Sequence, residues 1–312
     1  MNDRGLETDA PPRTPPELAP YLDEPPQLRS GAFGKNALLR LRFERRPARS
    51  ILALMERRAP LLVQKALYCD EGMPDLPVVF IITNSGGVLQ GDRYTMDFAV
   101  GPGACGHVTT QAATKIHEMD ANHAIQVQEI ALEDGAYLEY LPEPVIPFAR
   151  SRFLTRTRIR IAPSATLLYA ETLMGGRRHY GDGERFAFDV FSSTVVAERL
   201  SGESLFVEKF LIEPARSPVF RPGVMDDFDV FGNVLLLAPP AVADAVAAQA
   251  ACAWSPDEGW AAGVGRLPND AGLVYKITAR DSALVRARIR DFWSLVRPAA
   301  VGKPVPPEFA WR

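Results

Sequence analysis

The sequence has few cysteines and no long apolar run, and each absence excludes a class of protein. Its three cysteines, Cys69, Cys105 and Cys252, are far apart and form no C-x-x-C pair. This spacing predicts neither a disulfide framework nor a structural zinc site and favours a reducing compartment, so we expect a cytoplasmic protein. A run of about 18 apolar residues, or the apolar core of a signal peptide, is not found. We therefore expect no membrane anchor.

An excess of basic residues is also lacking. The 312 residues include 35 Lys and Arg against 38 Asp and Glu, which gives a formal net charge of -3. Such a chain has no overall positive field for a polyanion, so nucleic acid is not expected as a partner. Because 47% of the residues are hydrophobic, the composition is that of a globular protein with a sizeable core.

The first 30 residues differ from the rest of the chain. They are dense in proline and charged residues and have no apolar periodicity. Burial of apolar side chains therefore cannot offset the conformational entropy that these residues would lose on ordering. Residues 1–30 are therefore predicted to be a flexible, solvated tail, with binding of a partner as an alternative role. Residues 31–312 are expected to form a single domain.

Most of this domain is predicted to be β-structure, and the helices are expected near its C-terminal end. The expected strands are rich in β-branched and aromatic residues and are bounded by turn residues: 37–42, 78–83, 94–100, 124–132, 153–161, 166–173, 186–190 and 205–212. Two helices are expected over 241–253 and 283–297. Asp281 or Ser282 can cap the second helix, and Pro298 is expected to end it.

Three short segments resemble one another and recur roughly every 30 residues. Each has an apolar residue, a tight turn and an alanine that opens the next strand: VGPGA from Val100, LEDGA from Leu132 and IAPSA from Ile161. A strand–turn–strand unit with this period predicts a mainly β fold of stacked, helically coiled sheets, similar to a β-solenoid. A β-sandwich with regular hairpins is the alternative.

A glycine-rich loop, NSGGVLQGD from Asn84, follows one of the expected strands. Gly86 and Gly91 have the separation of the glycines in a phosphate-binding P-loop. However, Asp92 and Arg93 replace the Lys and Ser/Thr of that motif, and an acid at this position would repel a phosphate. We therefore expect the loop to turn the chain between strands and not to hold a nucleotide.

Other signals of catalysis or metal binding are weak. His107, His117 and His123 lie close together in the sequence, but without H-E-x-x-H spacing, so exposed or hydrogen-bonded histidines are favoured over a metal site. Glu139 and Glu171 are polar positions within apolar expected strands, where each fits a half-exposed sheet. As a pair they would suit general acid and base roles, so a β-helical carbohydrate-active enzyme is one alternative.

Six motifs follow one another in the order seen in a known family. They are GGVLQGD from Gly86, VGPGA from Val100, TTQAATK from Thr109, LPEPVIPFA from Leu141, LFVEK from Leu205 and LPNDAGL from Leu267. In this succession the chain closely resembles UreD (also called UreH), the family of urease accessory proteins. The resemblance runs from about Gly34 to Pro298 and leaves out only the tail and the last residues.

The resemblance implies a non-catalytic role. UreD proteins bind the urease apoprotein and UreF, and through UreF the GTPase UreG, so that nickel reaches the urease active site. The chain is then expected to be a scaffold with a β body and a few helices. No tightly bound cofactor is expected, because nickel would be in transit through a polar internal path.

The path positions of the family fall on Asp92, Thr114, Glu171 and Glu208, of which Thr114 and Glu171 match in type only. Nickel(II) is held tightly by clustered thiolates and imidazoles, so a conduit needs fewer and weaker ligands. Spaced carboxylates and hydroxyls meet this requirement. Gln90 departs from the family, which usually has a glycine there. A relative serving another nickel enzyme and a plain interaction module without metal passage are the remaining alternatives.

Overall fold

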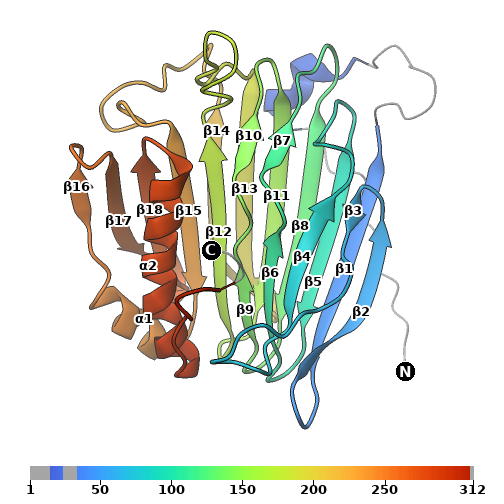
Figure 1. Cartoon of the computed structure of the whole chain (residues 1–312), viewed down its shortest axis with the longest axis vertical. Coiled ribbons are helices and arrows are strands. Elements are labelled where there is room, and N and C mark those ends of the chain that lie inside the picture. Colours follow the sequence, from blue (N-terminus) through green and yellow to red (C-terminus); the bar gives the residue numbers. More distant parts are fainter. Residues whose placement is uncertain (1–14, 24–33, 310–312) are drawn as a thin grey trace.

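The structure, a computed structural model that describes residues 15–23 and 34–309, consists of two β-sheets packed face to face (Figure 1). Two helices near the C-terminal end lie on the outer face of the larger sheet. Buried apolar side chains fill both the space between the two sheets and the layer between the larger sheet and the helices.

The smaller sheet has seven strands in the order β14-β13-β11-β8-β5-β1-β2. Its five inner strands are parallel to one another, and the two edge strands are antiparallel to their neighbours. The bounds are β1 (Asn36–Arg45), β2 (Ser50–Arg58), β5 (Arg93–Val100), β8 (Ala124–Leu132), β11 (Arg152–Ile161), β13 (Val190–Arg199) and β14 (Ser204–Ile212).

The larger sheet has eleven described strands, and its main path is β16-β17-β18-β15-β12-β9-β6-β4-β3, with β10 beside β12 and β7 beside β10. Its parallel part runs from β4 to β12, and the strands from β15 to β16 are antiparallel. The bounds are β3 (Leu61–Leu62), β4 (Val78–Thr83), β6 (Cys105–Thr110), β7 (Thr114–Ile116), β9 (Tyr137–Tyr140), β10 (Val145–Pro147), β12 (Thr166–Met174), β15 (Val230–Leu237), β16 (Ala253–Ser255), β17 (Trp260–Arg266) and β18 (Gly272–Ala279).

Between β4 and β13 the chain passes back and forth between the two sheets. From β6 on, and apart from the short strands β7 and β10, each strand pairs in parallel with the preceding strand of its own sheet, so that Cys105 lies beside Tyr137 and Tyr137 lies beside Thr166. These pairs are separated by about 30 residues, the period expected from the sequence. The prediction of a mainly β chain is confirmed, and parallel pairing excludes regular hairpins for these central strands. The solenoid-like description of the whole chain stays a prediction, because antiparallel strands flank this part.

The three similar turn segments stack on one another. The backbone N–H of Gly103 donates to the carbonyl of Asp134 over 2.9 Å, and the hydroxyl of Ser164 donates to the carboxylate of Asp134 over 2.9 Å. The alanine after each turn is buried, which leaves no room for a larger side chain between the sheets: Ala104, Ala136 and Ala165. The repeat therefore reflects turns that hydrogen-bond to their neighbours.

The two expected helices are present with different ends. They are α1 (Pro240–Ala247) and α2 (Ser282–Val301). Asp281 caps α2, because its carboxylate accepts a hydrogen bond from the backbone N–H of Leu284 over 2.9 Å. The expected end at Pro298 is wrong: the helix continues to Gly302, whose left-handed backbone (φ 68°) forms the cap. Two short 3-10 helices are η1 (Pro16–Tyr21) and η2 (Pro268–Asp270).

Two other expectations differ from the structure. The expected strand 186–190 is wrong, because Phe186 has a positive φ of 52° in a turn and β13 begins only at Val190. Within the predicted tail, η1 packs on the outer face of the smaller sheet. Leu18 is fully buried there against Leu154 and Val190, so this part is not the solvated chain expected. The rest of the tail lies outside the described residues.

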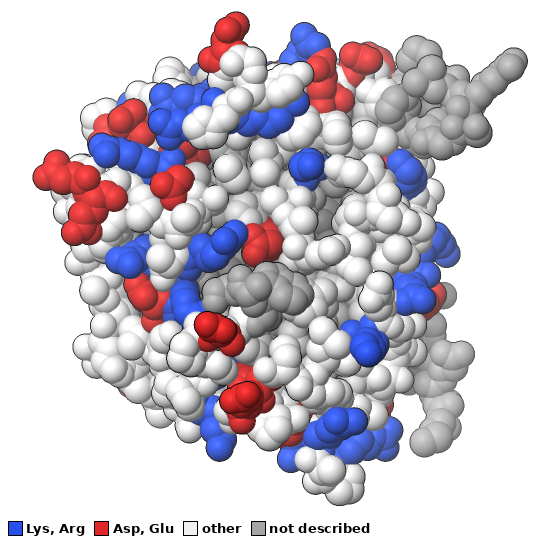
Figure 2. Space-filling model, viewed as in Figure 1, with Lys and Arg blue, Asp and Glu red and all other residues white. Residues whose placement is uncertain are grey.

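The surface around α2 carries both signs of charge. Figure 2 shows basic and acidic side chains next to one another along the margin, with wide uncharged areas between them. Among the residues described, none of the helices is long and apolar enough to cross a membrane.

Candidate functional site: a polar cavity between the sheets

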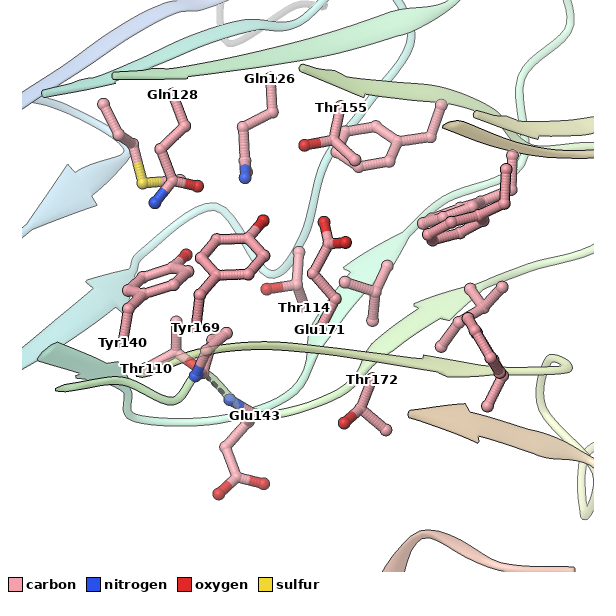
Figure 3. Close-up of a pocket in the computed structure, with 18 residues that line it drawn as sticks. Thr110, Thr114, Gln126, Gln128, Tyr140, Glu143, Thr155, Tyr169, Glu171 and Thr172 are labelled. Carbon is pink, nitrogen blue, oxygen red and sulfur yellow. Dashed lines mark hydrogen bonds between the residues drawn. The ribbon is translucent and has the colours of Figure 1, made fainter. Parts of the chain in front are cut away.

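A cavity of about 60 Å³, room for a few water molecules, lies between the two sheets (Figure 3). Aromatic rings and polar side chains line it together. From the smaller sheet come Gln126, Gln128 and Thr155, and from the larger sheet come Thr114, Tyr140, Tyr169 and Glu171. Two of the four path residues expected from the sequence, Thr114 and Glu171, are therefore brought together here.

Strand alternation places Glu171 in this cavity. Successive side chains of a strand point to opposite faces, so Tyr169 and Glu171 face the smaller sheet while Leu168 and Ala170 pack in the helix-facing layer. The Glu171 carboxylate then reaches across to β13, where the hydroxyl of Ser193 donates to it over 3.0 Å. Glu171 thus bridges the two sheets.

The environment of Glu171 disfavours its charge. Burial raises the pKa of Glu171 to about 7, and the nearby negative charge of Glu208 acts in the same direction. Hydrogen bonds from Tyr169, Ser193 and Asn233 oppose the rise only in part. Near neutral pH this carboxyl can therefore gain or lose a proton with little change in free energy.

Glu208 joins the cavity through a residue that the sequence analysis missed. Asn233 is paired with Glu171 across β12 and β15, and its side-chain N–H donates to the Glu208 carboxylate over 2.7 Å. Glu208 in turn contacts Lys276 on β18 at 2.5 Å. A signal was present, since Asn233 is the one polar side chain in VFGNVLLL from Val230.

Thr114 lies between the cavity and a second hollow. It lines both the central cavity and a space of about 170 Å³ beside Gly86 and Gly87. A Cβ atom on Gly87 would lie 2.6 Å from the His117 ring, and its φ is 154°, so a larger residue does not fit there. The glycine loop therefore allows a close approach next to Thr114.

Asp92 is placed differently from the other three path residues. It is fully buried in the turn before β5, and its two carboxylate oxygens accept hydrogen bonds from the backbone N–H groups of Lys35 and Leu89, each over 2.9 Å. It does not line the central cavity. Gln90 holds the same region, because its side-chain carbonyl accepts from the N–H of Asp120 over 2.9 Å. Asp92 therefore fixes the loop, and its role in a path stays a prediction.

Glu139, the other acid considered for catalysis, faces away from the cavity. It lies under α2, where Tyr137, Trp293 and Arg297 donate to its carboxylate over 2.6 to 2.7 Å, and His107 lies 2.7 Å away. Burial works against its ionisation, but hydrogen bonds and charges from Arg297 and His107 outweigh it and hold the pKa of Glu139 well below its usual range.

The opposite orientations of Glu139 and Glu171 correct one alternative. Two carboxylates act as acid and base on one glycosidic bond only when both flank it. Here the backbone of the larger sheet separates them, since Glu139 is among the helix-facing side chains and Glu171 lines the cavity. The paired-carboxylate site proposed from the sequence is therefore wrong.

Tight metal ligands do not gather in the part of the chain that the structure describes. No group of three or more His, Cys, Asp or Glu residues there could hold a metal ion, and the three cysteines are free. His117 lies 3.3 Å from the carbonyl of Gly86, and His123 lies 2.9 Å from the carbonyl of Tyr21. The expectation of hydrogen-bonded histidines is confirmed for these two.

A family model and two curated relatives describe proteins that are similar to this chain. Residues 35–312 match the family described as UreD urease accessory protein. Urease accessory protein UreD 2 of Brucella suis is 54% identical over 295 residues, which is 95% of this chain and 98% of that protein. Urease accessory protein UreD of Yersinia pseudotuberculosis is 52% identical over 297 residues, 95% of this chain and 92% of that protein. The chain therefore belongs to the UreD family of urease accessory proteins.

Proposed function

We propose that this chain is a scaffold in urease maturation and that nickel passes through its interior. In this role it binds the urease apoprotein and UreF, and through UreF the GTPase UreG. Family membership supports the maturation role. One observation supports the passage: Glu171 lines the polar cavity between the sheets, and a series of neighbouring polar side chains leads from it through Asn233 to the partly exposed Glu208.

The chemistry of this route suits a cation that must leave again. Carboxylate, amide and hydroxyl oxygens bind nickel(II) less tightly than thiolates or imidazoles do. Since conduction requires binding that is weak enough for release, few oxygen ligands at a time are favourable. Glu171 adds a charge that can be exchanged for a proton near neutral pH. In this proposal nickel is cargo, and a tightly bound cofactor is not needed.

The fold and the compartment belong to the same proposal. In this proposal the route lies between the two sheets, within the coil formed by the strands from β4 to β13, and the hydrogen-bonded turns hold neighbouring strands of that coil together. Three unpaired thiols fit a reducing compartment, so the cytoplasm is the proposed place of action.

Reconstitution tests the maturation role. Urease subunits are expressed with UreE, UreF and UreG, with and without this chain, and urease activity is measured after nickel is added. We expect little activation without the chain. Full activation in its absence would contradict the role. If another nickel enzyme and not urease depended on the chain, the alternative of a relative with a different client would be favoured.

Substitutions inside the route test the passage. Glu171→Gln and Glu208→Gln are expected to slow urease activation while the complex with UreF still forms. Glu198→Gln is a matched control, because Glu198 is also partly buried but pairs with the half-exposed Arg158 over 2.7 Å and does not line the cavity. Activation at the normal rate in both route variants would instead favour an interaction module without metal passage.

A further inference from the structure

The smaller sheet ends at β14, and polar side chains from both sheets meet at this edge. Among the described strands β14 pairs only with β13, whereas the larger sheet continues past it through β15 and β18. Glu208 comes from β14, Asn233 from β15 and Lys276 from β18. The edge is therefore the place where the interior of the protein approaches solvent.

The polar atoms at this edge form a continuous series. Asn233 is fully buried and donates to one oxygen of Glu208, while the other oxygen of Glu208 lies 2.5 Å from the ammonium of Lys276. The side chain of Glu208 is 20% exposed and that of Lys276 is 46% exposed. The Lys276 ammonium also lies 5.7 Å from the ring of Phe231, which lines the central cavity. Lys276 thus occupies the outer end of the route that begins at Glu171.

These groups have the composition of a weak oxygen site for a divalent cation. The Asn233 side-chain nitrogen donates to both carboxylates, that of Glu171 and that of Glu208, so a half-turn of the amide would place its oxygen between them. Carboxylate and amide oxygens are ligands for hard divalent cations. The Asn233 side-chain oxygen, although buried, has no hydrogen-bond partner within the described parts of the chain. A buried carbonyl oxygen without a partner normally has a reason, such as an ion or a water that it accepts.

We propose that the Lys276 ammonium is a resident cation at this mouth, which a divalent cation must displace from Glu208 before it can bind between Glu171, Asn233 and Glu208. This inference rests on the proposed function and names the residue that would control passage. An ammonium carries one charge and a divalent cation carries two, so the divalent cation can displace the ammonium from the Glu208 carboxylate. The competition with Lys276 lowers the apparent affinity of the site for that cation. Lys276 therefore lowers the dwell time of the cation and keeps Glu208 neutralised when the route is empty.

Direct binding to the purified full chain tests this inference without urease. Ni²⁺ binding is measured by isothermal titration calorimetry for the wild type, Lys276→Gln and Lys276→Gln combined with Glu208→Gln. Loss of one positive charge from a partly exposed site should tighten Ni²⁺ binding by about tenfold in Lys276→Gln. The double variant should lose this gain, because Glu208 is the carboxylate that Lys276 neutralises.

Two controls make the result specific. Lys209→Gln removes a lysine from the same edge strand, where Lys209 pairs with Glu17 on the opposite face over 2.7 Å, and it should leave Ni²⁺ binding unchanged. Lys276→Arg keeps the charge and should retain the wild-type affinity. The inference is overturned if Lys276→Gln binds Ni²⁺ no more tightly than the wild type, or if the gain persists without Glu208. Urease activation that does not require this chain would contradict the proposed function while leaving the binding result intact.

Discussion

Two buried glutamates on neighbouring strands of one sheet have opposite environments. Glu139 on β9 faces α2, where Arg297 and His107 hold its pKa well below the usual range against the effect of burial. Glu171 on β12 faces the cavity, where burial raises its pKa to about 7. On the helix-facing side the Glu139 carboxylate therefore stays ionised. On the cavity-facing side the Glu171 carboxylate can take up or release a proton near neutral pH.

This difference separates stability from transport within a single sheet. The Glu139 carboxylate accepts hydrogen bonds from β9 and α2, lies 2.7 Å from His107 of β6, and is shielded from solvent. It could bind an ion only if these contacts were broken. Glu171 has donors that are all uncharged, Tyr169, Ser193 and Asn233. A cation that arrives at Glu171 gains a charge interaction that no protein group already supplies.

The largest expected effect is on the helix-facing side. Arg297→Met leaves Glu139 and Asp70 buried without their cation, and breaking such a buried pair typically costs about 3–5 kcal/mol. Chemical denaturation of the purified protein measures this loss. Arg286→Met is the matched control, since Arg286 on the same helix pairs with Glu143 at the surface and should cost about 1 kcal/mol or less. An equal loss of unfolding free energy in the two variants would show that the buried ion pairs of Arg297 stabilise the fold no more than a surface pair does.

On the cavity side, stability should change in the opposite direction. Glu171 has a pKa of about 7 when folded against an ordinary value of 4.5, so the folded state binds the extra proton and loses stability as pH rises from 4.5 to 7. Glu171→Gln removes this cost. The variant should be more stable than the wild type above pH 7, on the order of 2 kcal/mol, with no gain below pH 4.5. Thermal melts across this range measure the difference, and a variant less stable at every pH would contradict the raised pKa.

Proton competition gives the next smaller effect. Glu171 titrates near neutral pH, with a pKa of about 7. The other charged groups at the site are Glu208 and Lys276, and Tyr169 lies beside Glu171. Ni²⁺ binding by the purified chain should weaken by about tenfold between pH 7.5 and pH 6, because the proton must leave before the cation binds. Glu171→Gln should flatten this dependence. An unchanged slope in the variant would assign the proton to another group.

The smallest expected effect sharpens the separation of the two faces. Asp281→Ala removes the cap of α2, which typically costs about 1 kcal/mol, while Asp281→Asn keeps an accepting oxygen for the N–H of Leu284. Because α2 packs on the helix-facing side, neither variant should change Ni²⁺ binding at Glu208. A change in binding with the alanine variant alone would mean that the two faces are coupled through the sheet.

The sequence predicted strands better than the faces of those strands. The bounds of β4 and β8 match the expected 78–83 and 124–132, because β-branched runs end there at turn residues. In contrast, β9 is buried along its whole length, so no polar face distinguishes the two sides and the orientation of Glu139 could not be read from alternation.

The candidate site was predictable only in part for a related reason. Thr114 and Glu171 came from the resemblance to the family, and they do line one cavity. Asn233 and Lys276 reach the site only because β15 and β18 pair antiparallel beside β12, a pairing that no local pattern specifies. Asp92 is the acidic residue of the motif GGVLQGD, yet its hydrogen bonds to the backbone hold it outside that cavity. Local patterns thus found the ligand types, and the tertiary pairing decided which of them meet.

The buried ion pairs of Arg297 can form only late in the synthesis of the chain. Asp70 precedes Arg297 by 227 residues, and Glu139 precedes it by 158 residues. Chains fold from the N-terminus as they leave the ribosome, so both acids exist long before their cation does. Burying them without their cation would be costly, so we expect this face of the sheet to stay hydrated until α2 has been synthesised. We expect Arg297 to act in this sense as a checkpoint, with the face closing only on a chain that has been translated beyond it.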